Sequence, residues 1–413
     1  MKVLILNDSD IDGGAARSAH RLHLGLRHIG LDSQMLVRAK VSDESTIVGP
    51  ASKREKFISK LRPFLESLPV RIYPARTGLV TPAVVPDSLA QHVNRLNPDI
   101  VHVHWVGNGF MRLESLARLR HPLVWTLHDM WAFTGGCHYD EGCGRYRKRC
   151  GPCPVLGSHS SHDLSRWIWN RKARLWPQLD VTIVTPSRWL SRCAAESTLL
   201  SGKRIETIPN GLDLRRYRPI EKSLARRLLG LPEDKQLILF GAVASTSDPR
   251  KGFHHLRPAL AELTRRGWGD KLELLVLGAS RPSVPHELSL TTHYLGRMAD
   301  DISLVLTYSA ADVFVAPSEQ DNLPNTVLEA MACGTPCVAF DIGGMSDLIE
   351  PGIGGYLATP FLPADLATGI EHVLRADAGS MSQTVRQKIE REFDIEQVAR
   401  RHHRLYEELR GRT

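Results

Sequence analysis

The chain has 413 residues, of which 42% are hydrophobic, and it carries a formal net charge of +8. This length predicts two or three domains, and the hydrophobic content provides sizeable cores and excludes a disordered chain. The basic residues are dispersed, which argues against a nucleic-acid partner, and no apolar run reaches the ~20 residues of a membrane-spanning helix.

Apolar runs rich in Val, Ile and Leu alternate with helical stretches along the chain. Continuous runs of this length are typical of strands buried on both faces of a parallel sheet. The predicted strands are Val3–Leu6, Ile100–Val103, Leu123–Leu127, Val181–Val184, Leu237–Phe240, Leu272–Leu277, Val313–Ala316 and Cys337–Phe340. The predicted helices include Ala15–His28, Phe253–Arg266, Thr326–Ala332 and Ile395–Arg410. This alternation predicts an α/β protein with Rossmann-like, doubly wound domains.

The N-terminus turns polar at Asp8 and lacks the apolar core of a signal peptide, so we expect a cytoplasmic protein.

The order of the elements also predicts how the domains divide. The strand–helix series restarts after the turn-rich stretch Pro209–Pro219. We therefore predict an N-terminal domain at 1–205, a C-terminal domain at 206–393, and a last helix at 394–413 that packs back on the N-terminal domain.

Two loops have residues suited to a phosphorylated ligand. Gly13 and Gly14 follow the first strand and open a helix, whose N-terminus favours an anion. The loop is not a GxGxxG fingerprint, and a tight turn is the alternative. Lys251 and Gly252 lie between a strand and a helix, where lysine can neutralise a phosphate and glycine allows close approach. An exposed basic turn is the alternative there.

The segment Ala316–Phe340 is the most informative part of the chain. It predicts a strand, a loop, a helix, a second loop and a second strand, with Asp321 in the first loop and Glu329 on the helix. A carboxylate on a helix can accept two hydrogen bonds from ribose hydroxyls, and the loop before it presents N–H groups to a diphosphate or a sugar. Carboxylates at this spacing are also common on solvated helices, so the spacing alone does not distinguish a ligand-binding site from a solvated helix face.

This segment resembles the hallmark of glycosyltransferase family 4, which are retaining enzymes with the two-domain GT-B fold. The family pattern is Glu, seven residues, Glu, and then Ala-Met-Ala-Cys-Gly-Thr-Pro-Val. The resemblance covers essentially the whole chain. Further segments that match the family are Pro209–Asp213, Lys251-Gly252, Gly354–Tyr356 and, in the first domain, His128-Asp129. It implies two Rossmann-like domains facing a central cleft, and sugar transfer from a nucleotide diphosphate-sugar to a saccharide or lipid-linked acceptor without a catalytic metal.

The resemblance also implies roles for individual residues. Glu329 would bind the donor ribose, Asp321 would contact the transferred sugar, and Lys251 would stabilise the leaving diphosphate. His128 would face the sugar, while Gly13 and Gly14 would line the cleft. The sugar and diphosphate would also meet the backbone of four loop residues, namely Asn322, Leu323, Pro324 and Asn325.

The sequence departs from the family pattern at two points. Asp321 stands where the family has Glu, which shortens the reach by one methylene and implies either a different sugar or a bridging water. The family's arginine is missing from Gly241–Ser245, and Arg250 is the candidate replacement. These departures leave a non-catalytic scaffold subunit as an alternative function. A nucleotide-sugar epimerase and a sugar phosphorylase are alternatives that share the fold.

The expected mechanism needs no carboxylate nucleophile, because none emerges from the sequence. Retention then proceeds by same-face attack, with the donor phosphate helping to remove the acceptor proton. Lys251 and helix N-terminal dipoles would stabilise the departing anion. Asp8-Ser-Asp10 resembles the metal-binding DxD motif of another glycosyltransferase class, but it ends the first strand, so we predict a turn-and-cap role.

Four of the seven cysteines fall in an insert at about residues 135–160, namely Cys137, Cys143, Cys150 and Cys153. Clustered cysteines in a cytosolic protein favour a metal, and Cys150-Gly-Pro-Cys153 is a zinc-type half-site. The wider gap between the other two leaves reduced thiols, disulfides or an iron–sulfur cluster as alternatives. The sequence resembles a family 4 subgroup with this insert. A structural Zn²⁺ would order the loop beside the cleft.

Two features concern a membrane surface. Ser165–Trp176 mixes Trp with Arg, and such a helix can lie at a membrane interface, although packing on the first domain is the preferred interpretation. Basic clusters at Lys53–Lys60, Arg145–Arg149 and Arg166–Arg174 are compatible with peripheral association at the inner face of a membrane or with an anionic acceptor. Solvated faces are the alternative.

Overall fold

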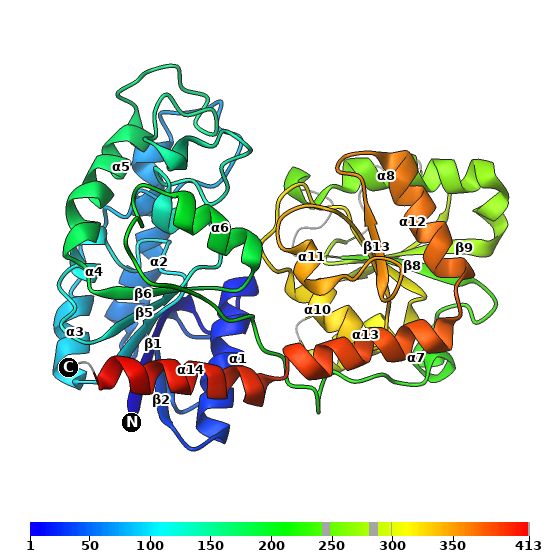
Figure 1. The fold of residues 1–413 in the computed structure, drawn as a ribbon, viewed down its shortest axis with the longest axis horizontal. Helices are drawn as coiled ribbons and strands as arrows, with labels where there is room; N and C mark the ends of the chain where they lie inside the picture. Colours follow the sequence, from blue (N-terminus) through cyan, green and yellow to red (C-terminus); the bar gives the residue numbers. More distant parts are fainter. Residues whose placement is uncertain (242–247, 281–287, 299, 412–413) are drawn as a thin grey trace. The chain divides into compact units, whose positions relative to one another are not determined.

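The computed structural model describes residues 1–241, 248–280, 288–298 and 300–411. The chain forms two compact units (Figure 1). Unit 1 comprises Met1–Gly211 and Glu396–Thr413, and unit 2 comprises Leu212–Ile395. The sequence places the divisions at 205/206 and 393/394, a few residues before those of the compact units. Each unit is built on a parallel sheet with helices on both faces, which confirms the predicted α/β class.

The described residues of unit 1 form one parallel sheet of seven strands. In spatial order these are β3 (Ile47–Val48), β2 (Asp32–Ala39), β1 (Lys2–Ser9), β4 (Ile100–Val103), β5 (Leu123–Thr126), β6 (Val181–Thr185) and β7 (Ile205–Thr207). The central strands β4, β5 and β6 are buried on both faces, as their largely apolar sequences predict.

Alternate strand residues in unit 1 face two helical layers. Val3 and Ile5 pack with one layer, and Leu4 and Leu6 pack with the other. The first layer is α1 (Gly14–His28) and α14 (Ile395–Arg410); the second is α3 (Leu89–Leu96), α4 (Leu113–Leu116), α5 (Leu164–Leu175) and α6 (Arg188–Glu196). α14 is fixed to the sheet by Tyr406, whose hydroxyl lies 2.6 Å from His102 Nδ1 on β4.

The described residues of unit 2 form a parallel sheet of six strands. In spatial order these are β10 (Thr291–Gly296), β9 (Leu272–Leu277), β8 (Gln236–Gly241), β11 (Val313–Ala316), β12 (Cys337–Phe340) and β13 (Gly355–Ala358). One face packs against α8 (Phe253–Leu263) and α12 (Pro363–Arg375). The other packs against α7 (Lys222–Leu229), α9 (Asp301–Ala310), α10 (Asn325–Ala332), α11 (Met345–Leu348) and α13 (Ala378–Glu392). Figure 1 shows α7, α10 and α13 on this side of the sheet, opposite α8 and α12.

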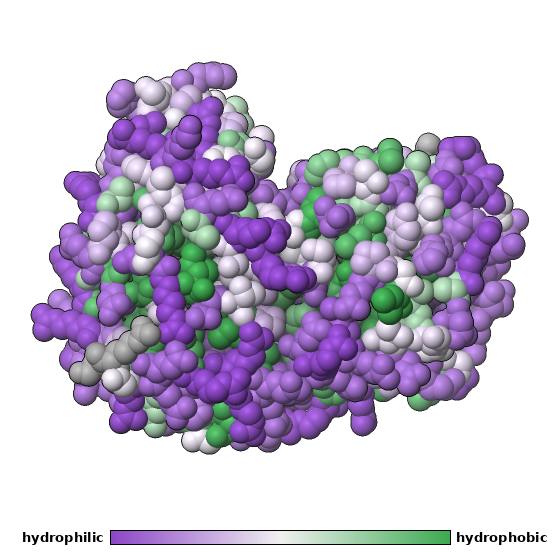
Figure 2. All heavy atoms as spheres, in the orientation of Figure 1, coloured by the Kyte–Doolittle hydropathy of each residue, from purple (hydrophilic) through white to green (hydrophobic). Residues whose placement is uncertain are grey.

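On the face shown in Figure 2, most surface side chains are hydrophilic, with hydrophobic ones in scattered groups. None of the helices in the described part of the chain combines the length and the hydrophobicity needed to span a membrane. Unit 1 also contains α2 (Lys53–Ser67), an exposed helix that has no counterpart among the predicted elements.

Candidate active site

An ion pair joins two loops at the carboxyl ends of the unit 2 strands, the edge where open α/β sheets bind ligands. Lys251 Nζ lies 2.7 Å from Asp321 Oδ2, and both side chains are largely buried. Lys251 ends a short 3-10 turn, Pro249–Lys251, that precedes α8, and Asp321 follows β11. Burial opposes ionisation of Asp321, but the Lys251 and Arg250 cations outweigh it and lower its pKa. The Asp321 carboxyl is therefore ionised at neutral pH.

Close backbone contact holds these loops together. Gly252 has φ +74°, and a Cβ there would lie 1.7 Å from the Pro317 carbonyl oxygen. The Glu319 N–H donates to the Arg250 carbonyl oxygen at 2.9 Å. Gly252 therefore permits the contact that brings Lys251 to Asp321. The predicted close approach of a phosphate to this glycine stays a prediction.

Arg250 faces the loop that carries Asp321. Its guanidinium donates to Asp248 Oδ2 at 3.1 Å and to the Gln320 carbonyl oxygen at 3.3 Å. The stretch from which the family arginine is missing lies, apart from Gly241, outside the described residues. Arg250 thus adds a second cation near Asp321, and its role as a replacement stays a prediction.

The loop Asn322–Asn325 and the start of α10 follow Asp321, as the sequence predicts. Asn322, Leu323 and Pro324 are buried, and the Asn322 N–H donates to Asp321 Oδ1 at 3.0 Å. Pro324 occupies the N-cap of α10, and no side chain caps this helix. An uncapped helix start beside a lysine is an environment that favours an anion.

Glu329 lies on α10, as predicted, and is almost fully buried. The Tyr308 hydroxyl, from α9, donates to Glu329 Oε2 at 2.8 Å. Burial and the nearby Glu329 charge raise the pKa of Tyr308, so the phenol remains a donor. Tyr308 orients the carboxylate expected to bind a ribose. The sequence did not indicate this tyrosine, because it lies 21 residues from Glu329 in the chain.

Next to this site, His254 and His255 both approach Glu319. Each Nε2 atom lies 3.0 Å from Glu319 Oε1. Among the residues that the structure describes, this is the only group of three or more metal-type ligands whose atoms all lie within 4.8 Å. His254 and Glu319 are exposed, and hydrogen bonds explain the arrangement, so we assign no ion to it.

Unit 1 gathers its candidate residues at the carboxyl ends of β1, β4 and β5. Gly13 has φ +97° at the N-cap of α1, and a Cβ there would meet no atom within 4 Å. The glycine is therefore required by the backbone conformation rather than by crowding. Gly14 is exposed and begins α1, whose start has no acidic residue and no side-chain cap.

His128 follows β5 and contacts a row of buried histidines. Its Nε2 lies 2.9 Å from Nδ1 of His104, and the His104 ring lies 4.3 Å from that of His102. Burial lowers the pKa of His128 to about 4 and those of His102 and His104 well below their usual value. His128 is therefore neutral at pH 7 and can exchange hydrogen bonds with a sugar hydroxyl without carrying charge.

Asp129, the next residue, connects the end of β5 to the cysteine-containing insert. It accepts hydrogen bonds from Trp105 Nε1 at 3.0 Å, from the Trp131 N–H at 2.8 Å, and from His138 Nδ1 at 2.7 Å. Burial would raise the pKa of Asp129, but His138 and the hydrogen bonds lower it. Asp129 thus fixes the backbone that positions His128.

The Asp8-Ser-Asp10 motif lies at the end of β1, as predicted, but it does not cap α1, whose start has no side-chain cap. Arg38 pairs with both carboxylate oxygens of Asp8 at 2.5 and 3.0 Å. Asp10 accepts from the N–H groups of Val41 and Ser42 at 2.8–3.1 Å. Both carboxylates are buried and occupied by protein donors, so the motif is not arranged as a metal site.

The four insert cysteines are not arranged as a closed zinc site. Tetrahedral zinc with Zn–S bonds of about 2.3 Å needs sulfur atoms about 3.8 Å apart. Within the described residues, which include Cys137, Cys143, Cys150 and Cys153, no three thiol sulfurs lie within 4.8 Å of one another. Thiolate chemistry suits zinc, but this spacing does not, and none of the four is in a disulfide. Cys193, Cys333 and Cys337 pack in the apolar cores, as predicted.

The Trp-rich segment packs on unit 1, which confirms the preferred interpretation. Trp176 is fully buried, and Trp169 packs against the same core. Arg171 on α5 pairs with Glu114 at 2.8 Å. α5 therefore does not present its aromatic side chains together at the surface.

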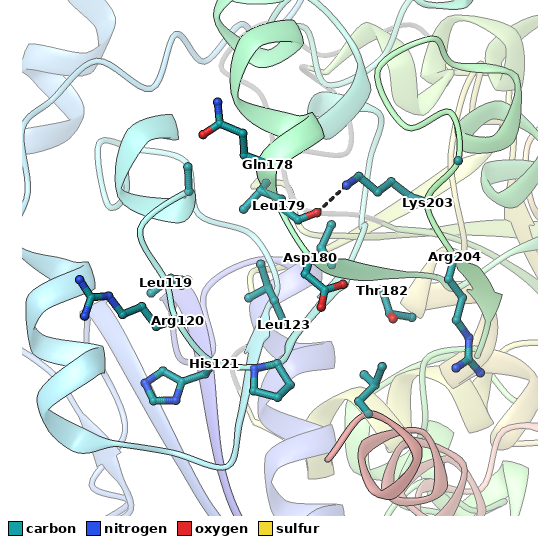
Figure 3. Close-up of a pocket in the computed structure, with 15 residues that line it drawn as sticks. Leu119, Arg120, His121, Leu123, Gln178, Leu179, Asp180, Thr182, Lys203 and Arg204 are labelled. Carbon is teal, nitrogen blue, oxygen red and sulfur yellow. Dashed lines mark hydrogen bonds between the residues drawn. The ribbon is translucent and has the colours of Figure 1, made fainter. Parts of the chain in front are cut away.

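A cavity of about 520 Å³ lies at the opposite edge of the unit 1 sheet (Figure 3). It is lined by the residues that precede β5, β6 and β7, including Arg120, Asp180 and Lys203, and by Leu409 of α14. The Lys203 ammonium is bound to the Leu179 carbonyl oxygen. Because this is the amino edge of a parallel sheet, we do not assign the donor to it.

Two family models match the chain consecutively. Residues 12–216 match "Glycosyltransferase Family 4", and residues 235–376 match "Glycosyl transferases group 1". Among curated proteins, D-inositol 3-phosphate glycosyltransferases are similar. That of Nocardia farcinica is 29% identical over 67% of this chain and 58% of its own length, and that of Acidothermus cellulolyticus is 33% identical over 70% and 62%. The matched part spans less than two thirds of these relatives.

Solved structures show the same fold. Sucrose-phosphate synthase from Thermosynechococcus elongatus matches all of this chain and all of its own with a TM-score of 0.68 at 18% identity. Anabaena HepE in complex with UDP and glucose matches 98% of this chain and 99% of its own with a TM-score of 0.61 at 18% identity. These likenesses establish the GT-B fold that the sequence predicts.

Proposed function

Because the chain combines a Glycosyltransferase Family 4 domain with a glycosyl transferases group 1 domain on a GT-B fold, we propose that it is a retaining hexosyltransferase. It transfers a sugar from a nucleoside diphosphate-sugar to a saccharide or lipid-linked acceptor, without a metal ion in the catalytic step. The observation that carries this proposal is the Lys251–Asp321 pair beside the uncapped start of α10.

The pair suits a donor whose diphosphate leaves. Lys251 offers a cation to the departing diphosphate, where a single preorganised donor contributes about 3–4 kcal/mol to transition-state stabilisation. Asp321 accepts hydrogen bonds from sugar hydroxyls, and Glu329, oriented by Tyr308, accepts them from the ribose. The UDP-glucose held by the structural relative HepE supports a nucleotide-sugar as the first donor class to test.

The bond changes balance without a protein nucleophile. The bond between the anomeric carbon and the diphosphate oxygen breaks, and the acceptor oxygen bonds to that carbon from the same face. The acceptor proton passes to the departing phosphate oxygen. His128, neutral at pH 7, exchanges hydrogen bonds with the sugar and takes no charge in the step.

The test is transfer from a panel of nucleoside diphosphate-sugars in EDTA, with the anomeric configuration of the product read by NMR. The expected result is a retained configuration and a kcat that falls about 10²–10³-fold in Lys251→Ala. Lys271→Ala, at an exposed position of unit 2, is the matched control and retains activity. Release of a free, epimerised donor would instead favour an epimerase, and turnover that requires phosphate as the acceptor would favour a phosphorylase. No turnover with any donor would favour a scaffold.

Structural Zn²⁺ at the four insert cysteines is a separate proposal, supported by their thiol chemistry and opposed by their spacing in this structure. Metal analysis of the purified protein tests it: one zinc per chain supports it, and zinc-free, fully folded protein overturns it.

A further inference from the structure

Helix α2 presents its hydrophobic side to solvent. Six large apolar residues on or directly after α2 are between 38% and 69% exposed, and we call them the α2 stripe: Phe57, Ile58, Leu61, Phe64, Leu65 and Leu68. Their spacing of three or four residues places them on one face of the helix. Ile72, shortly after the helix, extends this exposed surface. A contiguous apolar surface of this kind marks an interaction site.

The opposite, polar face of α2 holds the helix on unit 1. The Ser59 hydroxyl donates to the Arg38 carbonyl oxygen at 2.6 Å, and Arg62 Nε donates to the Gly109 carbonyl oxygen at 2.6 Å. The buried Glu66 carboxylate accepts from the N–H groups of residues 83–85. These buried polar contacts fix the rotation of α2, so the outward direction of the α2 stripe is built into unit 1.

The charges around the α2 stripe indicate what covers it. Lys53, Arg54, Lys56 and Lys60 are exposed, and none forms an ion pair with another residue in the described part of the chain. Glu55 is the exposed acid of the helix, and its carboxylate caps the N–H groups of residues 51 and 52. The helix therefore presents an apolar stripe with unpaired cations beside it.

A lipid surface fits this combination better than a protein does. Lysine is depleted at protein–protein interfaces, whereas basic residues beside a Phe- and Leu-rich helical face are typical of helices that lie in the headgroup region of a bilayer. Each lysine near an anionic leaflet adds attraction. Because the α2 stripe runs along the length of the helix, a membrane contact would place α2 in the interface plane.

We propose that α2 docks unit 1 on an anionic phospholipid surface, with the α2 stripe inserted among the acyl chains and Lys53, Lys56 and Lys60 at the headgroups. Sugar transfer is not part of this inference. The docking would, however, place unit 1 at the surface where a lipid-linked acceptor resides.

The experiment is sedimentation of the full-length chain with vesicles of phosphatidylglycerol and phosphatidylcholine in roughly equal parts, compared with pure phosphatidylcholine. The wild type is expected to bind the anionic vesicles preferentially and to be released by salt. Phe57→Ser/Phe64→Ser should reduce the partition coefficient about tenfold or more. Lys53→Gln/Lys56→Gln/Lys60→Gln should reduce it by roughly fivefold per lysine at low salt.

The matched control is Leu228→Ser/Ile302→Ser, which removes two exposed apolar side chains from unit 2 and should bind as the wild type does. Circular dichroism melting of every variant checks folding, and Ile58→Ser gives a milder second test of the stripe. No binding by the wild type, or equal binding by the stripe and control variants, overturns the proposal. A lipid-free dimer that the stripe variants dissociate also overturns it, in favour of a second copy. Because no donor or acceptor is present, the result does not depend on the proposed reaction.

Discussion

Gly252→Ala tests whether the close contact between the Lys251 loop and β11 is required. The residue has φ +74°, where a side chain costs about 1–2 kcal/mol. The new Cβ would lie 1.7 Å from the Pro317 carbonyl oxygen, so the loop must move by more than 1 Å. That movement adds about 1–3 kcal/mol of overpacking and loses the Glu319–Arg250 hydrogen bond, worth about 1 kcal/mol. The sum is about 3–6 kcal/mol.

Gly267→Ala provides the comparison, because Gly267 has φ +85° and open space around its Cβ position. Gly267→Ala should lose only about 1–2 kcal/mol of stability, which is the cost of a side chain at positive φ. Urea denaturation of both variants measures the free energy of unfolding, and Gly252→Ala should be at least about 2 kcal/mol less stable than Gly267→Ala. Equal stabilities would refute the close contact as the reason for the glycine, and with it the positioning of Lys251.

Two further predictions follow from buried polar groups. Tyr308→Phe leaves the Glu329 carboxylate without this donor and should cost about 1–3 kcal/mol in urea denaturation, whereas Tyr294→Phe, at a partly exposed position, should have little effect. Asp129 has a lowered pKa in the folded protein, so its contribution to stability is present above its unfolded pKa of about 4 and is lost as pH falls through the folded value. The stability difference between wild type and Asp129→Asn should therefore be constant from neutral pH down to about 5 and shrink below about 4; a difference that grows in acid would contradict this.

The sequence predicts the central strands well and the sheet edges poorly. Strands such as Val313–Ala316 and Cys337–Phe340 are buried on both faces, so their apolar runs are continuous. Edge strand β10, Thr291–Gly296, is partly exposed along most of its length and has no apolar run. β2, one strand in from the edge of its sheet, likewise begins with polar, alternating residues. Burial on both faces, rather than strand propensity alone, is what made a strand detectable.

The candidate site was predictable as a set of residues but not as a set of contacts. The motif places Asp321 in a loop and Glu329 on a helix, and both positions are confirmed. The pairing of Lys251 with Asp321 joins residues 70 positions apart, and Tyr308 reaches Glu329 from a neighbouring helix. Such contacts depend on the order of strands in the sheet, which a single sequence does not provide.

The orientation of helix α2 is a second feature that the sequence does not predict. An apolar stripe at helical spacing normally predicts a face turned toward the core. Here polar side chains such as Glu66 bind the unit instead, and the stripe faces outward. Only the tertiary contacts distinguish these two orientations, because the sequence period is the same in both.

The most direct test of the account is a crystal structure of the protein with a bound nucleoside diphosphate. The proposed function predicts a β-phosphate oxygen about 2.7–3.2 Å from Lys251 Nζ and ribose hydroxyls within hydrogen-bond distance of Glu329. A nucleotide found instead in the cavity lined by Arg120 and Lys203, with no contact to Lys251, would contradict it.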